Sequence, residues 1–327
     1  MTKSTSKTKK NRLARTLSAY EFLRLIPDEQ AAIDYLSPIL WPKGPTCPYC
    51  GSHRHNLKTQ ENYYFCKDCR KDYTIRVNTI FHRSHIPLNK WLFAMYLVVT
   101  ARKGISSLQL SKELGITYKT AWFLAHRIRT ACGSSTRRLL SGMLECDETY
   151  LGGKETNKHS DKKLNSGRGA VGKTPVFGIM TRNGQIITQP VIKTDSETLQ
   201  RIIGENARLG STICTDDNKA YIGLERKYEH KKVNHSAKQF VDGMAHTNSI
   251  ESVWAVLKRS FYGTYHNFSA FHTNLYLNEC TFRLNQGNVK YPTLSRIQSL
   301  TRGVSGKRLT YRGLIHGRMK PKSNKKR

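Results

Sequence analysis

The sequence predicts a multidomain α+β protein, because three segments with different patterns follow one another along its 327 residues. Two Cys-x-x-Cys pairs come first, a helical pattern broken by two glycines follows, and strand patterns with interspersed helices occupy the second half. A chain of this length has room for one domain of about 130 to 150 residues and for one or two smaller modules. We therefore expect small amino-terminal modules and a larger α/β domain.

The charge balance of the chain is strongly basic. Lys and Arg total 55 against 23 Asp and Glu, which gives a formal net charge of +32 and a pI near 10. Such a charge attracts polyanions, and nucleic acid is the leading partner. The most apolar run, 91–100, is far shorter than the roughly 20 residues that a bilayer requires, and the polar amino terminus lacks a signal-peptide pattern. We expect a cytoplasmic, nucleoid-associated protein without a membrane partner.

Four cysteines near the amino terminus form two pairs whose spacing is typical of a zinc ribbon. They are Cys47, Cys50, Cys66 and Cys69, with 15 residues between the pairs. Four thiolates complete a tetrahedron around one structural Zn²⁺ and leave no position for water. The alternatives are four reduced, buried cysteines, or a ligand exchange with His53 or His55. Ahead of the pairs, residues 20–40 predict two amphipathic helices, the second beginning at Pro27-Asp28-Glu29.

Three helices are predicted between Asn89 and Cys132. The first ends at Gly104, and the short second helix ends at Gly115. A longer third helix begins after Thr117. A short helix, a tight glycine turn and a longer helix are typical of a helix-turn-helix that binds DNA.

The third helix of this segment offers polar and basic side chains that could contact DNA. Residues near the amino end of a recognition helix reach base edges, and later basic residues meet phosphates. We therefore predict base contacts from Tyr118 and Lys119 and phosphate contacts from Arg127 and Arg129. The alternative is an ordinary packing helix with a solvated basic edge.

Strand patterns begin after a linker at 133–141. Asn183-Gly184 predicts a hairpin turn between the second and third strands. The order is three strands, a helix, one strand, a further strand and two helices, which is the layout of a ribonuclease-H-like α/β domain. The predicted strands are 143–151, 174–180, 185–193, 211–217 and 231–235, and the predicted helices are 196–207, 247–261 and 269–285.

Three acids in separate elements are candidate ligands of catalytic cations. Asp147 lies within an apolar strand, Asp216 ends another strand, and Glu251 lies near a helix start. A metal nuclease needs two or three carboxylates that converge on Mg²⁺, because two hard cations activate the attacking oxygen and stabilise the leaving one. In each adjacent pair of acids, strand alternation directs one toward the site and the other away, which leaves Glu148 and Asp217 as alternatives.

Glu251 has a second interpretation. The sequence Asn248-x-x-Glu251 is also a capping box, in which Glu251 ties down the helix start. Asn248 can serve as the cap while Glu251 turns to a metal, so the two interpretations are compatible. Lys258 follows two turns after Glu251 and could contact a phosphate.

These motifs, in this order, make the chain resemble the zinc-ribbon, DDE-type insertion-sequence transposases, the ISXO2-like group related to Merlin elements. The resemblance covers about residues 18–285. It rests on FLRLIPDEQAAIDYLSPILWPKGPTCPYCGS, YYFCKDCRKDYTIRVNTIF, CDETYLGG, TDDNKAY and HTNSIESVWAVLKR.

The resemblance implies a ribonuclease-H-like catalytic domain in which Asp147, Asp216 and Glu251 bind two Mg²⁺ or Mn²⁺ ions. There are 34 residues between Asp216 and Glu251, which suits the second interval of such triads. Part of the group has asparagine as its third residue, and here that residue would be Asn248. We keep Glu251 first, because a carboxylate holds Mg²⁺ better than an amide does.

The resemblance also implies a function. The expected protein binds terminal inverted repeats and target DNA as a homo-oligomer, cleaves 3′ ends and transfers them to target DNA. The alternatives are a non-catalytic zinc-ribbon and helix-turn-helix regulator derived from a transposase, and a nuclease that does not join ends. We predict five parts: a disordered basic arm at 1–17, a helical lead-in and zinc ribbon at 18–86, a helix-turn-helix at 87–135, a catalytic domain at 140–288 and a basic tail at 289–327.

Overall fold

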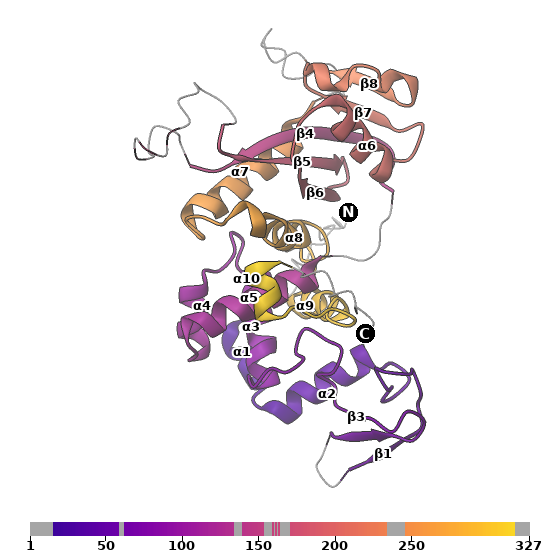
Figure 1. Ribbon diagram of the computed structural model, residues 1–327, viewed down its shortest axis with the longest axis vertical. Coiled ribbons are helices and arrows are strands. Elements are labelled where there is room, and N and C mark those ends of the chain that lie inside the picture. The colour runs from indigo at the N-terminus through magenta and orange to yellow at the C-terminus, as the bar shows by residue number, and fades with distance from the viewer. Residues whose placement is uncertain are drawn as a thin grey trace, which may run out of the picture.

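The computed structural model describes residues 16–58, 62–133, 139–153, 159, 161, 163, 171–233 and 246–317. It consists of a helical part with a small three-stranded sheet and a second part built on a five-stranded sheet, stacked along the long axis (Figure 1). This mixture of helices and sheets confirms the predicted α+β class. Most of the predicted basic arm, the interior of the 152–173 insertion and residues 318–327 lie outside the described residues.

The amino-terminal helices begin close to where their sequences predict, although the helix predicted to end at Gly104 already ends at Thr100. Asp28 caps the second helix through the backbone N–H of Ala31. Ser106 and Thr117 cap the fourth and fifth, and Gly115 between them takes a left-handed conformation with a φ of 58°. The helices are α1 (Ala19–Leu25), α2 (Glu29–Leu40), α3 (Leu88–Thr100), α4 (Ser107–Leu114) and α5 (Tyr118–Cys132).

Residues 289–317 do not form the predicted basic tail. They contain α9 (Thr293–Arg302) and α10 (Tyr311–His316). Ile297 and Leu300 of α9 are fully buried in the core formed by α1, α2, α3 and α5. The prediction was wrong because it rested on the basic composition of this stretch and overlooked its apolar residues at helical spacing. The amino end is likewise anchored at Leu17, which is buried in the same core.

The sheet part has the strand order β6-β5-β4-β7-β8. β4 pairs antiparallel with β5 and parallel with β7, while β6 and β8 form the two edges. Asn183 and Gly184 lie in the turn between β5 and β6, as predicted. The strands are β4 (Met143–Leu151), β5 (Thr174–Thr181), β6 (Ile186–Pro190), β7 (Thr212–Thr215) and β8 (Glu229–Lys232).

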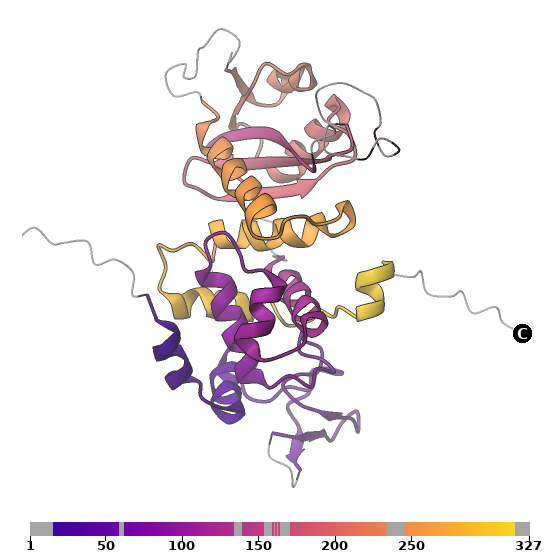
Figure 2. The same ribbon diagram turned by 90° about the vertical axis from the view of Figure 1, so that its left-hand side faces the viewer.

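Helices cover both faces of this sheet. α6 (Ser196–Asn206) packs on one face, where Leu199, Ile202 and Ile203 are buried with Phe177. α7 (Asn248–Gly263) and α8 (Thr273–Leu284) pack on the other. α8 lies between the sheet and the helical part, next to α5 (Figure 2).

The two parts meet at a buried ion cluster. Glu279 of α8 accepts hydrogen bonds from Arg129 of α5 at 2.7 Å, from Tyr265 at 2.7 Å and from Arg283. The Arg129 and Glu279 side chains are only 2% and 1% exposed. Burial opposes the charged form of Glu279, but Arg283 and Arg129 outweigh it and lower the pKa of this carboxyl. The helical part is therefore joined to the sheet part by specific charge pairs.

Candidate metal centres and nucleic-acid interface

The four predicted zinc ligands lie together at one end of the three-stranded sheet. The thiol sulfurs of Cys47 and Cys69 are 3.5 Å apart, and those of Cys50 and Cys66 are 3.6 Å apart. These separations are too long for disulfides and close to the edge of about 3.8 Å in a zinc tetrahedron with Zn–S bonds of about 2.3 Å. The donor set therefore fits one Zn²⁺ with four cysteine ligands.

The backbone around each cysteine pair forms the tight turn that such a site needs. Gly51 and Arg70 both have left-handed φ angles, of 78° and 55°. Their N–H groups donate to the carbonyls of Cys47 and Cys66. The strands are β1 (His55–Leu57), β2 (Tyr64–Cys66) and β3 (Asp72–Tyr73).

Few apolar side chains support this small sheet. Tyr64 stacks on Tyr73, and Trp41 meets both rings edge-on. Tyr49 and Tyr63, which lie in the same region of the sequence, are exposed and add little to this packing. A sheet with so little core depends on its metal for stability.

Three carboxylates of the sheet part form a second cluster. Asp147, Glu148 and Asp216 each offer an oxygen within 4.8 Å of the other two. Asp147 and Glu148 belong to β4, and Asp216 follows the end of the parallel neighbour β7. The structure therefore brings together two of the three predicted acids and adds Glu148, while Asp217 is exposed outside the cluster.

Both neighbouring acids of β4 reach the cluster, although strand alternation sends them to opposite faces. Asp147 contacts Trp254 of α7, and Glu148 contacts Tyr221 on the face covered by α6. The pairing of β4 with β7 ends at Glu145 and Cys214. After Glu145, β4 is no longer paired with β7. The side chains of Asp147 and Glu148 therefore both approach Asp216. For the pair Asp147 and Glu148, the prediction that one acid points away from the site is therefore wrong.

Asp147 is held by two hydrogen bonds. Its Oδ2 accepts from the indole Nε1–H of Trp254 at 2.9 Å, and its Oδ1 accepts from the backbone N–H of Glu148 at 2.8 Å. Burial raises the pKa of Asp147 to about 6, with smaller upward contributions from Asp216 and Glu251. The negative charge of Glu251 therefore contributes to the raised pKa of Asp147.

Glu148 is held by one aromatic hydroxyl. Tyr221 donates to its Oε1 at 2.7 Å. Burial raises the pKa of Glu148 to about 7, and the negative charges of Asp216 and Asp147 add to this rise. A cluster of half-buried carboxyl groups that resist ionisation suits a hard divalent cation, which would replace the protons.

The start of α7 differs from the predicted capping box. The helix begins at Asn248, and the preceding residue, Thr247, is its N-cap. The Thr247 hydroxyl donates to Oε1 of Glu251 at 2.9 Å, whereas a capping box would join Asn248 and Glu251. Both Asn248 and Glu251 are exposed on the first turn of the helix.

Two contacts set the position of α7 along β4. The buried Glu145 accepts the N–H of Ile250 at 3.0 Å and pairs with Arg182 at 2.7 Å. One turn later, Trp254 binds Asp147. Gly178 lies opposite Asp147 on β5, and a side chain there would overlap the Trp254 ring. The missing side chain makes room for the indole that holds Asp147.

The predicted DNA contacts of α5 divide into two groups. Tyr118 and Lys119 are exposed, and the Lys119 ammonium lies 4.8 Å from the ring centre of Tyr311 on α10. Arg127 and Arg129 are only 4% and 1% exposed. Their burial contradicts the prediction that they contact phosphates, because Arg129 pairs with Glu279 and Arg127 donates to the carbonyl of His82 between aromatic rings.

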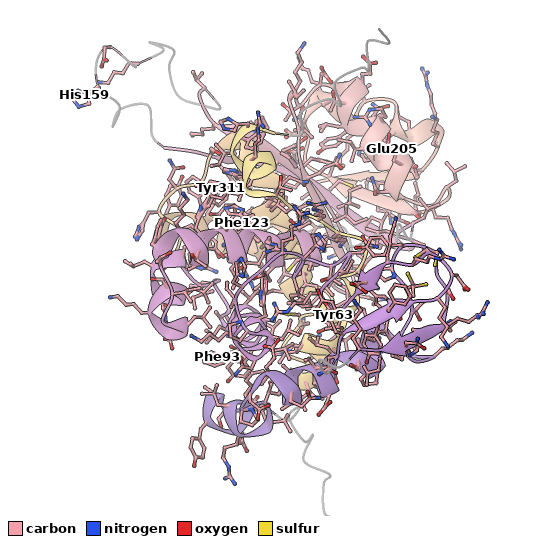
Figure 3. The ribbon with its side chains drawn as sticks, turned by 60° about the horizontal axis from the view of Figure 1, so that its bottom comes forward. Tyr63, Phe93, Phe123, His159, Glu205 and Tyr311 are labelled. Atoms are coloured by element: carbon pink, nitrogen blue, oxygen red, sulfur yellow. The ribbon has the colours of Figure 1, made fainter. Side chains whose placement is uncertain are left out.

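α10 covers part of the same helix. The Tyr311 ring meets Phe123 edge-on at 5.6 Å between centres, and the two side chains lie side by side in Figure 3. Tyr118 and Lys119 stay exposed at the amino end of α5. Lys258 on α7 is also exposed.

Glu148, predicted only as an alternative, joins the cluster, and Tyr221, Trp254 and Glu145 are functional candidates that had no role in the sequence-based prediction. Their signal in the sequence is position: Glu148, Tyr221 and Trp254 lie within the motifs CDETYLGG, TDDNKAY and HTNSIESVWAVLKR. Among the described residues, no helix is both long and apolar enough to cross a membrane.

Comparisons with known proteins agree with the two clusters. Residues 139–285 match the family model of the ISXO2-like transposase domain, and residues 27–72 match the transposase zinc-ribbon domain. A protein of Halobacterium salinarum described as an uncharacterized protein in transposable element ISH50 is 28% identical over 251 residues, covering 72% of this chain and 84% of that protein. An uncharacterized transposase-like protein of Haemophilus influenzae is 29% identical over 120 residues, covering 36% of this chain and 95% of that protein.

The two family matches together cover more than half of the chain, and each contains one of the two clusters. The cysteine pairs fall within the zinc-ribbon match, and the three clustered carboxylates fall within the transposase-domain match. The chain therefore carries an ISXO2-like transposase domain and, ahead of it, a transposase zinc-ribbon domain.

Proposed function

We propose that the protein is an active DNA transposase that binds the terminal inverted repeats of its element, cleaves their 3′ ends and joins them to target DNA. The meeting of Asp147, Glu148 and Asp216 within 4.8 Å carries this proposal. A non-catalytic DNA-binding regulator would have no need of this half-buried cluster of acids in a chain with a net charge of +32.

The sheet part suits this chemistry as a ribonuclease-H-like fold. The order β6-β5-β4-β7-β8, with one antiparallel hairpin on β4 and two parallel strands beyond it, supports that assignment. The carboxylates lie where β4 and β7 diverge, and such a strand end is a common place for a site in an α/β sheet.

We infer that the carboxylate cluster holds Mg²⁺ or Mn²⁺. Asp147 and Asp216 would be ligands, with Glu251 as the third and Asn248 as the second choice for that position. Two bound cations would activate the attacking oxygen and stabilise the leaving oxygen of a phosphodiester. Glu251 remains first because a carboxylate holds Mg²⁺ better than an amide does, and because its negative charge contributes to the raised pKa of Asp147.

The protein's own residues hold these ligands in place. Trp254 orients Asp147, Tyr221 orients Glu148, and the bond between Glu145 and Ile250 sets the start of α7. Side chains held by packing and hydrogen bonds keep a metal site in its working geometry, and their loss weakens metal binding.

The DNA-reading role belongs to the helical part in this proposal. α4 and α5, with their glycine turn, would form a helix-turn-helix that presents Tyr118 and Lys119 to base edges. The zinc ribbon would bind beside it, and Lys258 would contact a phosphate near the carboxylates. Assembly of two or more copies on paired ends would place both ends in one complex.

Cleavage of a duplex that carries one end of the element tests this proposal. A labelled duplex of the DNA that flanks the gene should be cut at a defined 3′ position when Mg²⁺ or Mn²⁺ is present. Specific binding with no cleavage in either metal would support the regulator instead.

Replacing Cys47 and Cys66 by serine should release zinc and unfold the ribbon. Each variant removes a thiolate from a four-ligand site, and the sheet has little core of its own. We expect less than one zinc per chain by atomic absorption and at least about tenfold weaker specific binding, the usual effect of losing a metal support. Cys132→Ser is the matched control, because Cys132 is buried far from the ribbon. Unchanged zinc content in both ribbon variants would disprove the site.

Trp254→Phe should raise the Mg²⁺ concentration needed for half-maximal cleavage by about tenfold. The substitution keeps an aromatic ring over Gly178 but removes the N–H that holds Asp147, and a hydrogen bond to a charged group contributes about 1.5 to 3 kcal/mol. Cleavage rates across a Mg²⁺ titration measure the effect, and saturating metal should restore most of the rate. Trp122→Phe on α5 is the control, and an identical Mg²⁺ dependence in both variants would contradict the positioning role.

A further inference from the structure

A pocket of about 360 Å³ lies at the junction of the two parts. It is formed by the turn after α3, the middle of α7 and the end of α8. Among the described residues that line it, four are basic and none is acidic. They are Arg102, Lys103, Arg259 and Arg283.

The turn that carries two of these basic residues is built to sit against the sheet part. Gly104 closes the turn by donating its N–H to the carbonyl of Ala101, and its φ is 86°. A side chain at this position would overlap the hydroxyl of Tyr265, which itself donates to Glu279. Arg102 and Lys103 are therefore held at the pocket by close packing rather than placed on a free loop.

The pocket keeps a positive charge after its ion pairs are counted. Glu279 is shared by Arg129 and Arg283, so this buried cluster carries one positive charge more than negative. Arg102, Lys103 and Arg259 are exposed, and none of them forms an ion pair with another described residue. A concave site with several free cations favours a phosphate.

The pocket also continues a line of exposed residues on α7 that starts at Glu251. Lys258 comes two helical turns after Glu251 and projects from nearly the same side of α7, and Arg259 is next to it. At a rise of about 1.5 Å per residue, Arg259 is about 12 Å along the helix from Glu251. This length equals the rise of roughly three to four base pairs of a B-form duplex.

We propose that this junction pocket binds a backbone phosphate of the DNA end while the carboxylates act on the scissile bond three to four base pairs away. The inference rests on the proposed function and says where the DNA substrate lies on the protein. Arg102 and Lys103 come from the helical part and Arg259 from the sheet part. A phosphate bound between them fixes the position of the DNA relative to both parts at once.

The salt dependence of DNA binding tests this proposal. The experiment uses the full chain with the additional substitution Asp147→Asn, so that the duplex is not cut, and measures binding of one labelled element end by fluorescence anisotropy over a KCl series. Each phosphate contact contributes about 0.9 to the slope of log affinity against log salt. Because these side chains share one phosphate, the double variant Arg102→Ala/Lys103→Ala should lower the slope by up to about one, and Arg259→Ala by no more than that, with affinity reduced about tenfold or more at low salt.

The matched control removes two exposed arginines elsewhere on the sheet part. Arg201→Ala/Arg226→Ala has the same change in net charge as the double pocket variant, and both residues are exposed. Equal slopes and affinities in the control and the pocket variants would overturn the proposal. Because binding is measured without cleavage, a wild-type protein that fails to cut but shows the predicted slopes refutes only the catalytic role. A protein that cuts but shows control-like slopes refutes only the pocket.

Discussion

Asp147→Asn is expected to abolish end cleavage, by at least about a thousandfold, while leaving DNA binding unchanged. The substitution keeps the shape of the side chain and an oxygen that can accept from Trp254. It removes the negative charge that a hard cation requires, and a loss of about 4 kcal/mol in barrier lowering corresponds to a thousandfold in rate. Asp216→Asn should have the same effect, since both oxygens belong to one cluster.

Single-turnover cleavage and anisotropy binding on the same duplex measure this prediction. Asp195→Asn is the matched control, because Asp195 only caps α6 and asparagine caps helices about as well. We expect wild-type cleavage from this control. If Asp147→Asn loses DNA binding in proportion to cleavage, or if it unfolds, the acid is structural and the catalytic assignment fails.

Glu279→Gln should destabilise the protein by about 3 to 5 kcal/mol. It removes the only carboxylate that pairs with Arg129 and Arg283 among the described residues, and it leaves two buried guanidinium groups without a counter-charge. Urea unfolding measures this loss of the free energy of unfolding. The dependence of that free energy on urea concentration should be unchanged. Glu205→Gln is the control, because Glu205 forms an exposed pair with Arg201 and should change stability by at most about 1 kcal/mol.

The same cluster predicts a pH dependence of stability. Because the pKa of Glu279 is lowered in the folded protein, its contribution is present above the unfolded value of 4.5 and is lost as the pH falls through the lower folded value. The difference in stability between wild type and Glu279→Gln should therefore shrink on acidification. A difference that stays constant down to the acid limit, or a Glu279→Gln variant as stable as the control, would show that the ion cluster contributes little.

The predictions that succeeded rest on local chemistry. The caps at Ser106 and Thr117, the left-handed Gly115 and the hairpin at Asn183-Gly184 are decided by neighbouring residues, so the sequence is enough to predict them. The meeting of Asp147 and Asp216 follows from the pairing of two parallel strands, because Asp216 comes directly after the end of β7, beside the part of β4 that carries Asp147.

The predictions that failed depend on partners far away in the chain. Arg129 looks like a phosphate contact on a basic helix, but its partner Glu279 is 150 residues away. The sequence around Arg129 contains no sign of that carboxylate. The stripe of Ile297 and Leu300 was overlooked because the basic composition of its surroundings suggested a tail.

Glu148 was predicted only as an alternative to Asp147, for a different reason. Alternation along β4 does send it to the face opposite Asp147, as expected. The rule assumes that a neighbouring strand separates the two faces, and β7 ends before it reaches Glu148. The length of β7 decides which acids join the cluster, and a strand end is difficult to predict from sequence.

A strand-transfer assay with Mg²⁺ or Mn²⁺ tests the central claim most directly. The substrate is a duplex with the DNA that flanks this gene, a plasmid serves as target, and Asp147→Asn serves as the inactive control. We predict joined products from the wild type, dependent on the metal and absent from the variant. Specific binding without any cut or joined product, or equal products from both proteins, would contradict the account; cut ends that are never joined would identify a nuclease instead.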